Sequence, residues 1–144
     1  MNSWTEGALA LIVVVALGIG LFLFTGESIG GDGGGAVDPQ PIVVDPEAAA
    51  RGQVLAEGQG CLQCHTIDGQ LASGPSWKGV AGSTRPLVGG DEVLADDAYL
   101  FNSIVAPHEQ VVEGYEPIMP EFYSDQLDEQ QINDLVEYVK SLAA

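Results

Sequence analysis

The two cysteines of the chain lie three positions apart, and a histidine follows at once, in the run Cys61-Leu62-Gln63-Cys64-His65. Two cysteines close at most one bridge, so a disulfide-rich scaffold is excluded. A lone disulfide would not explain the adjacent histidine. A thioredoxin-like dithiol requires a βαβ setting, which the sequence lacks. A structural zinc site requires two further ligands, and His108 is the only other histidine.

The same spacing is the attachment signature of c-type haem. Each thiol can add to one vinyl group of the haem, which forms two thioethers. The residue that follows then lies beneath the iron, where the Nε2 atom of His65 can bind it. The sequence therefore predicts one covalently attached haem c, bound through Cys61 and Cys64 and ligated by His65.

An iron that only transfers electrons usually has a second axial ligand. The candidates are Met119 and His108, because Met1 lies before a long apolar segment. Met119 falls in the run Ile118-Met119-Pro120, on a loop between two predicted helices. A methionine there could be a core residue, but it is the only one after residue 1, and we predict it as the ligand. His108 has polar and charged neighbours and is expected at the surface.

An apolar segment at the N-terminus, Ala8 to Phe24, contains no charged or strongly polar residue. With Trp4 to Gly7 it spans 21 residues, or about 31 Å of helix, which is close to the roughly 30 Å of a bilayer core. A cleaved signal peptide is the alternative. The first six residues carry no Lys or Arg, however, and no A-x-A site follows Phe24. We therefore expect residues 1–24 to be a transmembrane anchor in membrane lipid.

The rest of the chain divides at about residue 45. Residues 25–44 are rich in Gly and Pro and are typical of a linker. Residues 45–144 are enough for one modest core around a large prosthetic group.

The chain holds 21 Asp and Glu against 4 Lys and Arg, which excludes nucleic-acid binding through a basic patch. Residues 45–144 hold 17 of these acids and all four cations, so their net charge is −13 before any haem is counted. This acidity predicts a redox partner with a basic docking patch, although solubility alone would also explain it.

Three helices are predicted in residues 45–144. The first runs from about Pro46 to Glu57 behind an Asp45 N-cap, and the second covers Asp97–Val105. The third opens at a capping box at Asp128 and ends near Leu142. Few strand signals appear, so we expect a mainly α domain whose long loops wrap a haem.

The segment from Gly52 to Leu142 resembles class I cytochromes c, which fold as three or more helices around one haem. The residues that carry the resemblance are Gly52, the CLQCH run, Gly74-Pro75, Gly79, the helix with Tyr99, the IMP run and Tyr138. The stretch ADDAYLFNSIVAPHEQVVEGYEPIMP looks like the cytochrome c domain of haem–copper oxidase subunit II and like the monohaem cytochrome subunit of alternative complex III. No copper-site cysteines exist, so the chain is not itself an oxidase subunit II.

The resemblance implies roles for further residues. Gly52 and Tyr138 would let the first and last helices cross closely. The Pro75 carbonyl would accept a hydrogen bond from Nδ1 of His65. Trp77 replaces a smaller aliphatic residue of the family and either contacts the haem or fills a void. Arg85 either pairs with a haem propionate or is a surface charge.

The His108 position is commonly Asn in the family. The resemblance also implies electron transfer rather than enzymatic catalysis, within a respiratory or photosynthetic quinol-oxidising or oxidase complex. The haem domain would then lie on the periplasmic or extracellular side of a bacterial plasma membrane. A membrane-tethered electron shuttle is one alternative. A haem enzyme or gas sensor with an open iron position is the other.

Overall fold

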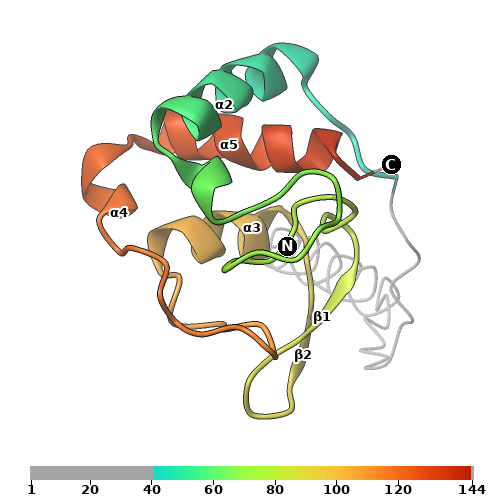
Figure 1. Cartoon of the computed structure of the whole chain (residues 1–144). Coiled ribbons are helices and arrows are strands. Elements are labelled where there is room, and N and C mark those ends of the chain that lie inside the picture. Colours follow the sequence, from blue (N-terminus) through green and yellow to red (C-terminus); the bar gives the residue numbers. More distant parts are fainter. Residues whose placement is uncertain (1–40, 144) are drawn as a thin grey trace, which may run out of the picture. The chain divides into compact units, whose positions relative to one another are not determined.

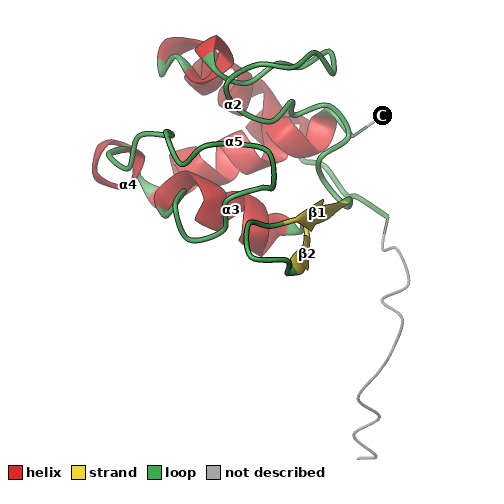
Figure 2. Cartoon of the chain, turned by 60° about the horizontal axis from the view of Figure 1, so that its bottom comes forward, coloured by secondary structure: helices red, strands yellow, loops and turns green. Residues whose placement is uncertain are grey.

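The structure, a computed structural model, describes residues 41–143. Within this part of the chain the fold is four α-helices, one short 3-10 turn and one small hairpin, joined by long loops (Figures 1 and 2). In chain order the elements are α2 (Pro46–Gly58), η1 (Cys61–Gln63), β1 (Thr84–Pro86), β2 (Glu92–Leu94), α3 (Asp97–Val105), α4 (Tyr123–Gln126) and α5 (Glu129–Ser141). The prediction of a mainly α domain is confirmed.

The predicted anchor, residues 1–24, and all but the last four residues of the predicted linker, 25–44, lie outside the described residues. Across residues 41–143, none of the helices combines the length and apolar character needed to cross a bilayer. The anchor and the linker stay predictions.

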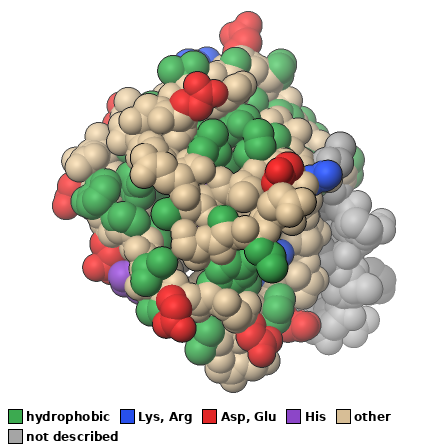
Figure 3. All heavy atoms as spheres, viewed as in Figure 1, with side chains coloured by type: hydrophobic (Ala, Val, Ile, Leu, Met, Phe, Trp, Pro, Cys, Tyr) green, Lys and Arg blue, Asp and Glu red, His purple; other side chains and the backbone are tan. Residues whose placement is uncertain are grey.

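Acidic side chains are spread over the face of the domain seen in Figure 3, and few basic ones accompany them. Two of the four cations of the chain form ion pairs: Arg51 pairs with Asp134, and Lys140 pairs with Asp97 and Glu137. The described surface is therefore strongly acidic.

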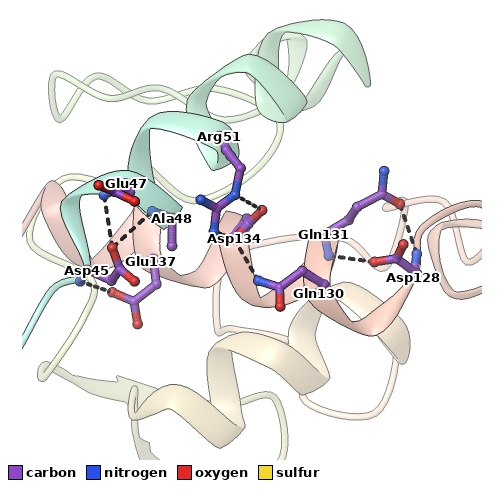
Figure 4. A network of polar contacts seen from close by, with 9 residues as sticks. All are labelled: Asp45, Glu47, Ala48, Arg51, Asp128, Gln130, Gln131, Asp134 and Glu137. Carbon is purple, nitrogen blue, oxygen red and sulfur yellow. Dashed lines mark hydrogen bonds and ion pairs between the residues drawn. The ribbon is translucent and has the colours of Figure 1, made fainter.

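The three predicted helices form because their ends are capped locally. Asp45 accepts hydrogen bonds from the N–H groups of Glu47 and Ala48, at 2.9 and 3.1 Å. Asp128 and Gln131 form the predicted capping box at the start of α5 (Figure 4). Helix α3 has the predicted bounds, and the other two differ from prediction by one residue at their C-terminal ends.

Helix α4 and the two strands of the hairpin were not predicted from the sequence. Helix α4 has four residues, and β1 and β2 have three each and pair antiparallel, with Arg85 opposite Val93. Elements this short lack enough residues to show a periodicity.

Helices α2 and α5 lie side by side (Figure 1) and make the most extensive contact between elements of residues 41–143. They approach most closely at Gly52. A Cβ built on Gly52 would overlap the carbonyl oxygen of Asp134 and would lie 2.9 Å from the Cβ of Tyr138. The close crossing at Gly52 and Tyr138, expected from the family resemblance, is confirmed.

Ion pairs reinforce this crossing. Arg51 donates to both carboxylate oxygens of Asp134, at 2.8 Å from Nε and 2.7 Å from a terminal nitrogen (Figure 4). Asp134 is buried and also accepts from Gln130 at 3.0 Å. The hydrogen bonds from Arg51 lower the pKa of Asp134. On the other side of α5, buried Lys140 donates to Asp97 of α3 at 2.9 Å.

We predict that Gly52→Ala lowers the free energy of unfolding of the haem-loaded protein by about 1–3 kcal/mol, because the added methyl group overpacks the crossing. Urea unfolding followed by circular dichroism measures it. Gly58→Ala is the matched control: it lies in the same helix with nothing within 4 Å of the added Cβ. An equal loss in both variants would contradict a steric cause.

Arg51→Gln should also destabilise the fold, and the deficit should depend on pH. A lowered folded-state pKa means that Asp134 contributes stability above its unfolded pKa of about 4, and that this contribution is lost as pH falls through the folded value. Urea midpoints of wild type and variant should therefore differ at pH 7 and converge in strong acid. Lys78→Gln removes an exposed cation without an ion pair among residues 41–143 and serves as control. A deficit that persists unchanged at the lowest pH would refute the assignment.

Candidate functional site

Cys61 is the first residue of the 3-10 helix η1, and Cys64 is the residue that caps its end. Gly60 enters it with φ of +75°, a conformation that favours glycine. The N–H groups of Cys64 and His65 donate to the Cys61 carbonyl at 3.2 and 3.0 Å. Because residues i and i+3 eclipse in a 3-10 helix, Cys61 and Cys64 project to the same side. Both thiols are free and line one cavity.

This cavity has a volume of about 400 Å³ and a largely apolar wall. Helix α3 contributes Tyr99, Leu100 and Ile104, and α5 contributes Leu135, Val136 and Val139. All seven site residues predicted from the sequence line it: Cys61, Cys64, His65, Pro75, Trp77, Arg85 and Met119. The fold thus brings together residues that are up to 58 positions apart in the chain.

His65 is held in one orientation. Its Nδ1 atom lies 2.8 Å from the carbonyl oxygen of Pro75, the contact that the family resemblance implied. Since a carbonyl only accepts, Nδ1 carries the proton and the lone pair is left on Nε2. Burial lowers the pKa of His65, which favours the neutral imidazole that binds metals.

Two neighbours confine the same ring. A Cβ on Gly74 would lie 2.7 Å from Cε1 and 2.9 Å from Nδ1 of His65, so the backbone there approaches the ring as only glycine allows. Trp77 stacks on the ring of His65, with centroids 5.1 Å apart and planes inclined by 23°. Trp77 also meets Tyr138 edge-on at 6.0 Å. It therefore lines the cavity and packs on the predicted proximal ligand, a contact the sequence did not indicate.

Met119 is half-buried and lines the same cavity from the loop between α3 and α4. His108 is exposed, as predicted, with 38% of its side chain accessible. It nevertheless forms a hydrogen bond, because its Nε2 lies 3.0 Å from the carbonyl oxygen of Met119. No sequence pattern signalled this bond.

Arg85 reaches the cavity from β1 and is half-buried. It forms no ion pair with a carboxylate of residues 41–143. Its position lets a guanidinium meet an acidic group inside the cavity, and the prediction of a propionate partner stays open.

Comparison with known proteins agrees with this arrangement. The family model described as Cytochrome c matches residues 49–143, which is more than half of the chain. A search of curated proteins finds no significant match. The chain therefore belongs to the cytochrome c family, whose members bind haem c covalently and transfer electrons.

Proposed function

We propose that the cavity holds one haem c, bonded through thioethers to Cys61 and Cys64 and ligated by His65 and Met119. The cavity residues fit such a group. A volume of about 400 Å³ falls within the roughly 300–1,000 Å³ of cofactor pockets. Its wall is largely apolar, and among the polar groups that line it are the two thiols, the imidazole of His65 and Arg85, together with the thioether of Met119. These are the groups that covalent attachment, axial ligation and propionate pairing require.

The surrounding residues set the state of the proximal ligand. The Pro75 carbonyl fixes the His65 tautomer and raises the basicity of the ring, since it accepts the Nδ1–H. Gly74 and Trp77 lie close to the His65 ring and therefore limit its rotation. The chain thus supplies a preoriented Nε2 donor.

The observation that carries electron transfer is that Met119 lines the same cavity as His65. If His65 and Met119 both bound the iron of a haem held there, no coordination position would be left for a substrate. When bound, the haem supplies a one-electron Fe(III)/Fe(II) couple, and a thioether ligand favours Fe(II) relative to a second imidazole. The closed site therefore favours an electron carrier with a fairly high potential over an enzyme or gas sensor.

Met119→Ala should open the iron. The oxidised variant should lose the near-infrared band that arises from methionine sulfur bound to Fe(III), and the reduced variant should bind carbon monoxide without denaturant. Absorption spectroscopy measures both. Ile118→Ala, at the exposed neighbouring position, should leave the band in place. A wild-type protein that lacks the band and binds carbon monoxide would instead support the open-site enzyme or sensor.

We further propose that the protein is a fixed subunit of a quinol-oxidising or oxidase complex in a bacterial plasma membrane, with its haem domain on the periplasmic or extracellular side. The likeness of residues 95–120 to such subunits and the apolar run 8–24 support this. The excess of acids over cations suits a partner with a basic docking patch, an attraction that salt weakens.

Membranes solubilised in mild detergent should show this chain migrating with a large complex that oxidises quinol or reduces oxygen. Native electrophoresis with haem staining measures the migration. Migration of the chain alone, at the size of one subunit, would favour the alternative of a tethered shuttle.

A further inference from the structure

His108 lies directly after the end of α3, in a turn that is fastened to that helix. The N–H of Ala106 donates to the Asn102 carbonyl at 2.8 Å, and the N–H of Glu109 donates to the Ala106 carbonyl at 3.1 Å. The side chain of Asn102 also donates to Glu109 at 3.1 Å. These hydrogen bonds fix the backbone of the turn that carries His108.

The segment that carries Met119, residues 115–122, has few hydrogen bonds of its own. Within residues 41–143, its backbone N–H groups donate only to carbonyls two or three positions back. The bond between Nε2 of His108 and the Met119 carbonyl, at 3.0 Å, is the one hydrogen bond that joins this described segment to a residue more than four positions away. Met119 also packs against the apolar cluster that contains Tyr123 and Leu135, and His108 adds the long-range hydrogen bond that joins the segment to the turn after α3.

The chemistry of this bond fixes its direction. A carbonyl oxygen only accepts, so Nε2 of His108 carries a proton and donates it. Methionine has three rotatable side-chain bonds and little rigidity of its own. The sulfur of Met119 therefore keeps a defined position only if the backbone from which it extends is held.

A second contact of His108 is weaker. Its Nδ1 atom lies 3.3 Å from a carboxylate oxygen of Glu121, whose side chain is 68% exposed. Exposed pairs of this kind contribute little. Of the two contacts of His108, the hydrogen bond to the Met119 carbonyl is therefore the one that can fix the position of residues 115–122.

We propose that His108 is a positioning residue for Met119: its Nε2–H holds the Met119 carbonyl and thereby keeps the thioether at the iron. This inference rests on the proposed function, in which Met119 is the second axial ligand. It assigns a role to a residue that the sequence alone placed only at the surface.

The test uses the full-length, haem-loaded protein in its oxidised form, with imidazole as a competing ligand that must displace Met119. His108→Phe keeps an aromatic ring and removes the donor. Its apparent affinity for imidazole should rise roughly 3- to 10-fold, as expected for the loss of one net hydrogen bond that opposes opening. His108→Gln offers an amide N–H in place of Nε2–H and should stay within about twofold of wild type.

Glu121→Gln is the matched control, because it removes the carboxylate contact and leaves the carbonyl bond intact. It should also stay within about twofold of wild type, by the small contribution of an exposed pair. If His108→Phe leaves imidazole affinity unchanged, or if Glu121→Gln reproduces its effect, the proposal is wrong.

The wild-type spectrum separates this proposal from the proposed function. A wild type without the near-infrared methionine band overturns both. A wild type with the band, together with an unaffected His108→Phe, overturns only the role of His108. Urea midpoints of the same variants give a further check. A change in the midpoint without any change in the band or in imidazole affinity would mark His108 as merely structural.

Discussion

The close crossing of α2 and α5 at Gly52 is the contact on which the rest of the domain depends. Glycine is required because the Asp134 carbonyl occupies the place of a Cβ. Helix α5 thereby becomes a shared wall: one face packs on α2, and Leu135, Val136 and Val139 on another line the cavity. Since about 100 residues surround a large cavity, little protein is left for a solid core, and this crossing supplies much of the direct helix packing.

Two different segments of the cavity wall hold His65 and Met119. The segment from Gly60 to Trp77 controls the proximal side: a 3-10 turn aligns two thiols, Pro75 fixes the tautomer of His65, and Gly74 and Trp77 confine its ring. The loop that carries Met119 has few hydrogen bonds of its own: Met119 packs on an apolar cluster, and its carbonyl accepts a long-range hydrogen bond from His108. The two predicted iron ligands are thus held in different ways: His65 by a hydrogen bond and close contacts to its ring, and Met119 by apolar packing and the bond from His108.

The four cations of the described residues lie in different environments. Arg51, which is exposed, and Lys140, which is buried, each form an ion pair that joins α5 to another helix. Arg85 lines the cavity. Lys78 and Arg51 are the exposed cations of the described residues, and of these two only Lys78 has no carboxylate partner there. The acidic surface expected from composition is therefore retained in the fold, because acids far outnumber cations among the described residues.

The sequence by itself determined what depends on near neighbours in the chain. The caps at Asp45 and Asp128 placed helix ends within one residue, and the C-x-x-C-H spacing with the single later methionine identified residues that share one cavity. Helix α4, the hairpin that carries Arg85, the stacking of Trp77 on His65 and the bond from His108 to Met119 were decided by tertiary structure. Their physical reason is the same: the first two are too short for periodicity, and the contacts join side chains whose approach is set by the packing of distant segments.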